Sequence, residues 1–148
     1  MDTNAELETD WPNLAMTKYE ITSRYTSEYN CLAWAVGEDD CWWSPLPEED
    51  YYWPEGVPRE HTLQAFVKAY QIYGYEICDS SELEIGFEKI AIYVKVSEEP
   101  QHVARQLPSG MWTSKLGRYE DIEHELDGLV GELYGSVRQC MKRALKIK

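Results

Sequence analysis

The residues best suited to covalent chemistry are Asn30 and Cys31, which are followed by a short apolar run and Gly37. Asparagine often caps a helix, because its side-chain oxygen accepts a hydrogen bond from a free backbone N–H of the first turn. A thiol at the positive end of a helix tends to have a lowered pKa. Cys31 is therefore a candidate nucleophile, and the alternative is a packed core cysteine, since free cysteines are often buried.

A cysteine nucleophile needs a general base, and the histidines of the chain are His61, His102 and His124. His61 opens an expected helix, and we interpret it as an exposed residue. His102 stands at the start of an expected strand, where a sheet would hold its imidazole in a fixed direction towards a helix-borne thiol. Cys31 and His102 are therefore the expected catalytic pair.

The residue that would orient the base depends on the register of a hairpin around Ser109-Gly110. With a three-residue loop, His102 shares a sheet face with Ser114, which bonds an imidazole only weakly. A loop longer by one residue puts Thr113 and Lys115 on that face instead, and a cation there would lower the basicity of the imidazole. Ser114 is therefore a candidate catalytic residue in the first of these registers.

Asp121 and His124 are the other candidates for orienting the base. On an expected short helix they are neighbours on one face, and they could form a pair. Aspartate is also a common helix cap, which is the interpretation we favour for Asp121. His124 is kept among the candidate catalytic residues.

The substrate site is expected around the cysteine helix. The backbone N–H of Cys31 suits a developing oxyanion, and the second donor would be Asn30, if it is not the cap, or Tyr25 or Tyr29. Residues 38–60 contain four prolines and many aromatic residues, which is typical of a long ordered loop. Such a loop either forms a substrate wall or lies on the domain as a hydrophobic flap. The predicted oxyanion and substrate residues are Asn30, Trp42, Trp43, Trp53 and Trp112.

The elements that would position these residues follow from hydrophobic spacing and turn signals. Helices are expected from Cys31 to Gly37, from Thr62 to about Tyr73, over 119–126 and over 136–146; strands are expected over 18–23, 75–78, 89–96, 101–106 and 111–116. This order predicts an α+β fold with a small antiparallel sheet, N-terminal helices packed on it and C-terminal helices. Residues 1–14 are expected as a loose acidic arm and residues 15–148 as a single domain.

Composition narrows the class of protein. The chain has 148 residues and a net charge of −13, which disfavours nucleic acid and anionic membranes and favours a basic partner. Its four cysteines lack CxxC spacing, so neither a disulfide framework nor a zinc site is expected, and no cofactor is implied. No apolar stretch is long enough for a transmembrane helix, and no signal peptide is evident. We expect a cytoplasmic protein, or one exported by a signal-independent route. The basic residues from Arg138 to Lys148 are expected on a solvated helix face.

Together, Asn30-Cys31 with its small apolar helix, a central strand and a later histidine at a strand start resemble the papain-like cysteine hydrolase superfamily. The small bacterial branch, which includes cell-wall endopeptidases and amidases, is the most similar. The resemblance covers Tyr29 to about Gly117, and the stretches 110–117 and 121–124 are similar to uncharacterised small bacterial proteins. It implies a papain-like fold and a cysteine peptidase or amidase activity.

Two functions follow from these observations. The first is a cysteine hydrolase or acyltransferase that acts on an amide, peptide or isopeptide bond, with a peptide or protein as substrate, as in a bacterial toxin or peptidase. The second is a non-enzymatic acidic module, such as an immunity or adaptor protein, that binds a basic protein partner. In the second hypothesis Cys31 is a core residue and the fold is a degenerate form of the enzyme.

Overall fold

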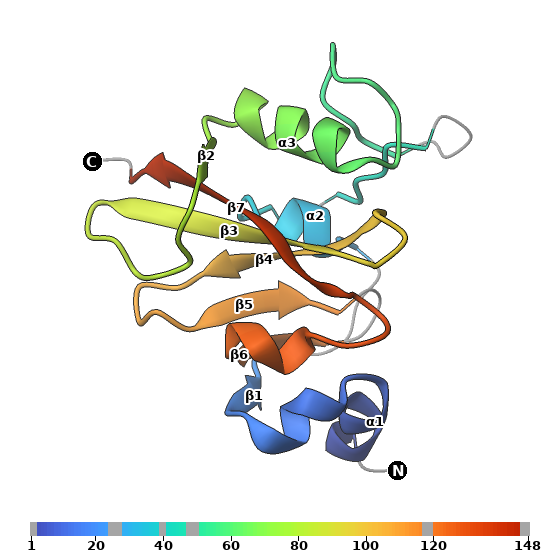
Figure 1. The fold of residues 1–148 in the computed structure, drawn as a ribbon, viewed down its shortest axis with the longest axis vertical. Coiled ribbons are helices and arrows are strands. Elements are labelled where there is room, and N and C mark those ends of the chain that lie inside the picture. The colour runs from blue at the N-terminus through green and yellow to red at the C-terminus, as the bar shows by residue number, and fades with distance from the viewer. Residues whose placement is uncertain (1–2, 24–27, 39–40, 47–50, 117–119, 146–148) are drawn as a thin grey trace.

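An antiparallel sheet forms the centre of the computed structural model, which describes residues 3–23, 28–38, 41–46, 51–116 and 120–145 (Figure 1). Within these residues the sheet has seven strands in the order β1-β6-β5-β4-β3-β7-β2. Their bounds are β1 Tyr19–Ile21, β2 Glu76–Cys78, β3 Phe87–Val94, β4 Pro100–Gln106, β5 Trp112–Lys115, β6 Asp121–His124 and β7 Ser136–Ala144.

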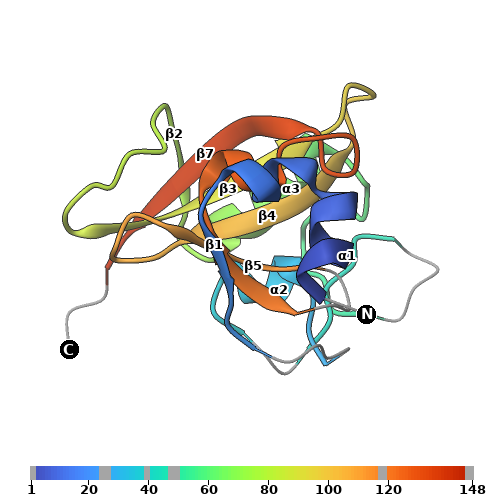
Figure 2. The same cartoon turned by 90° about the horizontal axis from the view of Figure 1, so that it is seen from below.

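The helices are short and lie outside the sheet. Their bounds are α1 Thr3–Asp10, α2 Cys31–Trp34 and α3 Leu63–Ile72, with 3-10 turns η1 Pro12–Met16 and η2 Leu126–Leu129. Figures 1 and 2 show α1 beside the β1 end of the sheet, α3 at the β2 end, and α2 near β4 and β5 between them.

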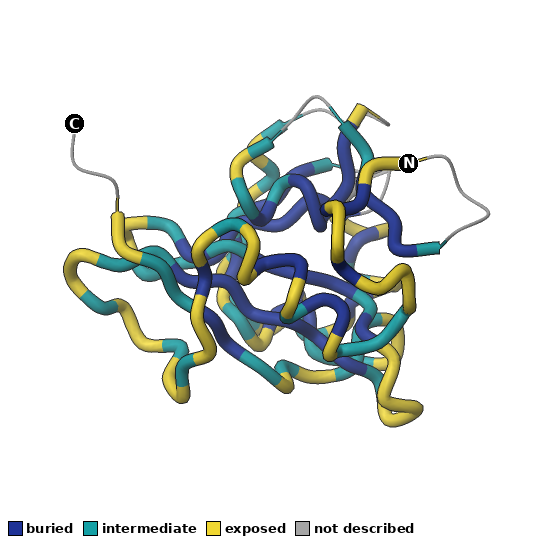
Figure 3. Tube along the Cα trace, turned by 90° about the horizontal axis from the view of Figure 1, so that it is seen from above, coloured by how far each residue is buried: buried dark blue, intermediate teal, exposed yellow. Residues whose placement is uncertain are grey.

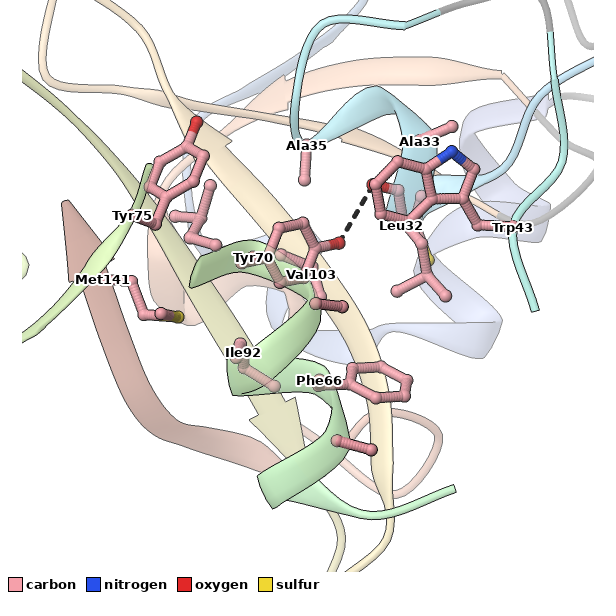
Figure 4. Packing of buried hydrophobic residues seen from close by; sticks show 14 of the residues in the cluster. Leu32, Ala33, Ala35, Trp43, Phe66, Tyr70, Tyr75, Ile92, Val103 and Met141 are labelled. Atoms are coloured by element: carbon pink, nitrogen blue, oxygen red, sulfur yellow. Dashed lines mark hydrogen bonds between the residues drawn. The ribbon is translucent and has the colours of Figure 1, made fainter. Parts of the chain in front are cut away.

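Each face of the sheet carries its own hydrophobic core, because successive side chains of a strand point to opposite faces. On β3, Ile90 and Ile92 belong to the core under α2 and α3, which we call the helix-side core. Ala91 and Tyr93 belong to the core under the N-terminal segment, which we call the arm-side core. Figure 4 shows the helix-side core, in which the Tyr70 hydroxyl donates a hydrogen bond of 2.9 Å to the Leu32 carbonyl. In Figure 3 the buried segments run through the middle of the molecule.

The predicted fold class, a papain-like α+β domain with a small sheet, is wrong. The expected helices over 119–126 and 136–146 are strands β6 and β7, so the protein is mainly an antiparallel sheet and lacks the papain-like arrangement with C-terminal helices. β7 lies between β3 and β2, and therefore buries Cys140 on one face and Met141 on the other. Burial on both faces produced the spacing that imitates an amphipathic helix.

The basic residues of β7 also differ from the expectation of a solvated helix face. Arg138, Lys142 and Arg143 form ion pairs with Glu98, Glu84 and Glu88. These acids lie on β3 or in the segments flanking it, so the ion pairs join β7 to neighbouring parts of the chain.

Other local predictions are confirmed. The Thr62 side chain caps α3 by accepting a hydrogen bond of 3.2 Å from the Ala65 N–H. β4 and β5 form the predicted hairpin with its three-residue loop, because Gln106 pairs with Trp112 and the Leu107 N–H donates to the Met111 carbonyl.

The N-terminal segment is ordered rather than loose. Residues 3–10 form α1, and η1 follows directly. Leu7, Trp11 and Leu14 are buried in the arm-side core and fix this segment to the sheet. This segment covers the sheet face that carries His102, as described next.

Candidate active site

Asn30 caps α2, as the sequence predicts. Its Oδ1 accepts hydrogen bonds from the backbone N–H groups of Ala33, at 3.4 Å, and Trp43, at 3.1 Å. Its Nδ2 donates to the Trp43 carbonyl at 2.7 Å. The side chain therefore joins the start of α2 to the aromatic loop. Because Asn30 is the cap, it is not the second oxyanion donor.

The Cys31 thiol lies at the start of α2 in the helix-side core. Burial raises its pKa to about 11, while hydrogen bonding from the backbone N–H groups of Val103, Cys31 and Leu32 acts in the opposite direction. The lowered pKa expected at a helix start is thus not found, since α2 has four residues and desolvation outweighs its dipole. At neutral pH Cys31 is a thiol held among backbone donors.

His102, Ser114 and His124 form a continuous hydrogen-bonded line across β4, β5 and β6. His102 Nε2 lies 2.9 Å from Ser114 Oγ, which lies 2.7 Å from His124 Nε2. His124 Nδ1 lies 2.7 Å from the Glu125 carbonyl oxygen. All three side chains are fully buried. The structure therefore brings together three of the four predicted catalytic residues, and we call them the imidazole line.

Protons along the imidazole line can be assigned from its fixed end. The Glu125 carbonyl only accepts, so His124 Nδ1 carries the proton and His124 Nε2 is an acceptor. Ser114 must then donate to His124, and its oxygen accepts from the Nε2–H of His102. This leaves the Nδ1 of His102 without a proton. That atom is buried and has no hydrogen-bond partner among the described residues, so its lone pair is available as a base.

Both imidazoles are neutral at physiological pH. Burial lowers the pKa of His124 to about 4, although its hydrogen bond to the Glu125 carbonyl acts in the opposite direction. Burial and the nearby His124 hold the pKa of His102 well below its usual range. The lowered pKa values of both histidines agree with neutral rings that each carry one proton, on Nε2 of His102 and on Nδ1 of His124.

Tyr134 is a residue of this site that the sequence analysis missed. Its ring stacks on the imidazole of His102, with the centroids 4.2 Å apart and the planes 5° from parallel. The Trp11 ring packs on the same tyrosine, with the ring centroids 5.2 Å apart. The following Gly135 has φ +79°, and a Cβ there would lie 2.1 Å from the Val94 carbonyl oxygen. Tyr134 is therefore held against His102 by a turn that needs glycine, a signal present in the Tyr134-Gly135 sequence.

Cys31 and His102 lie on opposite sides of the β4 backbone. His102 and Val103 are consecutive, so their side chains point to opposite faces, and the Val103 N–H interacts with the thiol. α2 contacts both β4 and β5. Among the described residues, no hydrogen bond joins the thiol to His102, whose Nε2 bonds Ser114. The backbone of β4 thus separates the thiol from the imidazole, and the predicted pair makes no direct hydrogen bond.

A groove with a volume of about 200 Å³ opens at the start of α2. Its lining comes from α2, the aromatic loop, the start of α3 and the start of β4: Asn30, Cys31, Leu32, Trp42, Trp43, Ser44, Pro45, Leu46, His61, Phe66, Pro100 and Gln101. The groove therefore reaches Cys31 on one side and the residue before His102 on the other. It is the site at which a substrate would meet the thiol.

The predicted aromatic substrate residues separate in the structure. Trp42 and Trp43 line the groove, and Trp43 is almost fully buried, with its Nε1 3.2 Å from a Glu38 carboxylate oxygen. Trp53 packs beside Trp43 in the helix-side core but does not line the groove. Trp112 lies in the arm-side core, on the face of His102. The aromatic loop thus acts partly as groove wall and partly as core.

His61 also lines the groove, which the sequence analysis did not anticipate. Its Nε2 bonds the Pro100 carbonyl, its Nδ1 lies 3.9 Å from a Glu99 carboxylate oxygen, and its ring stacks on Phe66. About 35% of its side chain is exposed. His61 is therefore a second imidazole that could reach a bound substrate.

The predicted Asp121–His124 pair is absent, because these residues lie on strand β6 and point to opposite faces. The Tyr29 hydroxyl donates a hydrogen bond to the Asp121 carboxylate. Tyr29 is therefore not the second oxyanion donor. Tyr25 lies outside the described residues.

The described residues contain no group of three or more His, Cys, Asp or Glu side chains arranged to hold a metal ion. Within the same residues, helices long and apolar enough to cross a membrane are absent.

Residues 20–142 match a protein family described as a domain of unknown function (DUF7689). Because the match covers most of the 148 residues, the chain belongs to this family. The matched region includes Cys31 and the whole imidazole line. No curated protein and no solved structure matches the chain.

Proposed function

We propose that the protein is a cysteine hydrolase or acyltransferase that acts on an amide, peptide or isopeptide bond. Cys31 is the nucleophile and His102 is the general base. The observation that carries the proposal is the Nδ1 of His102, which is buried, unprotonated and without a partner, one residue from the Val103 N–H that interacts with the thiol. Covalent catalysis by cysteine requires the nucleophile and the base within hydrogen-bond reach, so the proposal requires the thiol and His102 Nδ1 to come into contact when a substrate occupies the groove.

In the proposed reaction the Cys31 sulfur attacks the carbonyl carbon of a substrate bound in the groove. The thiol proton moves to His102 Nδ1 as the bond to sulfur forms. The leaving amine then takes that proton, and an acyl thioester remains on Cys31. Water, activated by the same imidazole, hydrolyses the thioester, or a second amine accepts the acyl group.

The remaining members of the imidazole line position the base. When His102 gains a proton, its Nε2–H still donates to Ser114, so Ser114 and His124 keep the ring in one orientation during the transfer. The backbone N–H groups of Cys31 and Val103 are the available donors for a developing oxyanion, because the side chains of Asn30 and Tyr29 are otherwise engaged.

The proposal also explains why thiol and imidazole are both neutral at rest. With the pKa of Cys31 raised to about 11 and that of His102 held low, an ion pair is disfavoured until a substrate occupies the groove. Proton transfer in concert with attack avoids a separate buried charge. We therefore expect low reactivity towards simple alkylating reagents and higher reactivity towards acyl donors that fit the groove. None of the four cysteines, all of which lie in the described residues, is in a disulfide, which is compatible with a reducing compartment, and we propose the cytoplasm.

The test is acyl transfer from p-nitrophenyl acetate, an activated ester that needs no specific recognition. The full chain is mixed with the ester, the release of nitrophenol is followed, and mass spectrometry of the digested protein locates the acetyl group. We expect an acetyl thioester on Cys31. Release should drop by on the order of 100-fold or more in Cys31→Ala and His102→Gln, since each removes one partner of the proton transfer.

His61→Gln is the matched control, because it removes the imidazole that lines the groove and leaves the imidazole line intact. Its rate should stay within a few-fold of the wild type. Loss of activity in His61→Gln with retention in His102→Gln would replace His102 by His61 as the base. Equal release by wild type and Cys31→Ala would contradict the hydrolase.

The second candidate function is an acidic binding module, which is favoured by the raised pKa of Cys31 together with the net charge of −13. In that case the groove binds a segment of a basic protein and Cys31 only packs. A protein that binds its partner with unchanged affinity after Cys31→Ala, and forms no acetyl thioester, would support this function instead.

A further inference from the structure

Cys78 on β2 and Cys140 on β7 lie directly opposite each other in an antiparallel pair. Residues in this relation share a face of the sheet, and their Cα atoms are about 4.5–5.5 Å apart. Disulfides bridge Cα atoms that are about 4.4–6.8 Å apart, so the backbone already has the spacing that a bond requires. Both thiols are free in the structure.

The two side chains also share their surroundings. Cys140 belongs to the arm-side core, and Cys78 is partly buried against it. Both line a surface cavity together with Asp79, Val137 and Gln139. The Cys78 thiol donates to the Ser80 carbonyl at 3.5 Å, a contact that a rotation of the side chain would release. A small reagent in the cavity can therefore reach the pair.

The other two cysteines lack this arrangement. Cys31 is in the helix-side core on the opposite face of the sheet, and Cys41 is half-buried beside Glu38 in the aromatic loop. The pair is thus distinct from the candidate active site. Cys78 and Cys140 do not form a CxxC motif, the usual sequence signal of redox cysteines. They are distant in the chain and adjacent only in the sheet.

We propose that Cys78 and Cys140 are a redox modification site, at which glutathione disulfide forms a reversible cross-strand disulfide. The more exposed Cys78 thiolate attacks glutathione disulfide, which breaks its S–S bond, forms a mixed disulfide and releases one glutathione thiolate. The Cys140 thiolate then attacks the Cys78 sulfur, forms the Cys78–Cys140 bond and releases the second glutathione. The two cysteines are oxidised by two electrons, the glutathione disulfide is reduced, and each protein thiol proton ends on a glutathione.

The bond would fix the edge of the sheet. β2 has three residues and is held only by its pairing with β7 in the strand order of the described sheet. A covalent link between residues so far apart in the chain restricts the unfolded state, so the oxidised protein is more stable. The melting temperature should rise by on the order of 5–10 °C on oxidation and return after reduction.

The experiment uses the full chain, reduced and then equilibrated with glutathione disulfide. Free thiols are blocked with N-ethylmaleimide, and the digested protein is mapped by mass spectrometry. We expect two of the four thiols to be lost within the monomer, a linked peptide that joins Cys78 to Cys140, and the rise in melting temperature. Cys41→Ser, the matched control, should behave in the same way. Cys78→Ser and Cys140→Ser should form no internal disulfide and show no rise.

Two outcomes would overturn the proposal. In the first, Cys78 and Cys140 of the wild type carry N-ethylmaleimide or separate glutathione adducts after equilibration. In the second, the linked peptide joins other cysteines or two chains. Both outcomes are read from the wild-type protein, so they hold even if a serine variant fails to fold. Neither depends on the activity of Cys31.

Discussion

The two halves of the candidate site, Cys31 and the imidazole line, lie in different environments on the two faces of the sheet. On the helix-side face, Cys31 borders a groove of about 200 Å³ and is approached by backbone N–H groups. On the arm-side face, the imidazole line is fully buried under η2 and Tyr134, with Trp11 packed behind. One face is open to a ligand, and the other is sealed from water.

This difference separates two tasks. In the proposed reaction, the open face admits a substrate to the thiol and the closed face keeps the His102 imidazole neutral and oriented, and the two groups must come into contact for the proton to move. The cost is that both groups are desolvated, which raises the pKa of Cys31 and lowers that of His102. Substitutions on one face can therefore be compared with substitutions on the other.

The largest effect is expected from removing the cover of the closed face. Trp11→Ala deletes a buried indole from the arm-side core, and the free energy of unfolding should fall by about 3–5 kcal/mol. Urea unfolding followed by circular dichroism measures this loss. Met16→Ala is the control in the same segment, because Met16 is 78% exposed, and it should change stability by less than about 0.5 kcal/mol. Equal effects of the two variants would show that the N-terminal segment does not cover the site.

A similar effect is expected from acid, and it arises on the closed face. His124 is neutral when folded and has a pKa of about 4, whereas an unfolded histidine gains its proton below about pH 6.5. The unfolded state therefore binds more protons between these values, and the free energy of unfolding should fall by about 3 kcal/mol as the pH drops from 6.5 to 4. His102 acts in the same direction.

Urea unfolding of wild type and His124→Gln across that pH range isolates the contribution of His124. The variant should show a flatter pH dependence, whatever its stability at pH 7. Parallel slopes for wild type and His124→Gln would contradict a buried neutral imidazole.

A smaller effect separates neighbours on one strand. Ser114→Ala leaves two buried imidazole nitrogens without a partner and should cost about 1–3 kcal/mol of stability, with acetyl transfer to Cys31 reduced by on the order of 10-fold. Thr113, the preceding residue of β5, faces the opposite side, where its hydroxyl accepts a hydrogen bond from Trp34 Nε1 at 3.0 Å. Thr113→Ala should lower stability by about 1 kcal/mol and leave the rate unchanged. Equal rates in both variants would remove Ser114 from the site.

The smallest effect concerns the ring stacked on the base. Tyr134→Leu loses the aromatic contact with His102. The free energy of unfolding should fall by about 0.5–1.5 kcal/mol more than the lost buried apolar area alone would cause. Tyr134→Phe keeps the stacked ring and should retain both stability and acetyl transfer. A rate that falls as far in Tyr134→Phe as in Tyr134→Leu would assign the role to the hydroxyl instead of the ring.

Local signals in the sequence predicted the parts of the site that local chemistry determines. The Asn30 and Thr62 caps are satisfied within three residues, and the hairpin register follows from a short loop, so Ser114 was placed beside His102 correctly. These features depend on neighbouring residues, which a sequence displays directly.

The rest depended on partners that are distant in the chain. β6 and β7 are strands because β1, β5, β3 and β2 pair with them, and this pairing overrides their helical spacing. The same error placed Asp121 and His124 on one helix face, whereas the strand puts His124 at the end of the imidazole line. Tyr134 was missed because its contact with His102 arises only when the turn before β7 folds back on the sheet.

The central claim is that the imidazole line leaves the Nδ1 of His102 unprotonated at neutral pH. Long-range ¹H–¹⁵N NMR of the histidine rings measures this directly, with His102→Gln and His124→Gln used for assignment. The account predicts that His102 is the neutral Nε2–H tautomer and His124 the neutral Nδ1–H tautomer, and that neither changes between pH 6 and about 8. A His102 ring that carries its proton on Nδ1, or that titrates near pH 6.5, would contradict it.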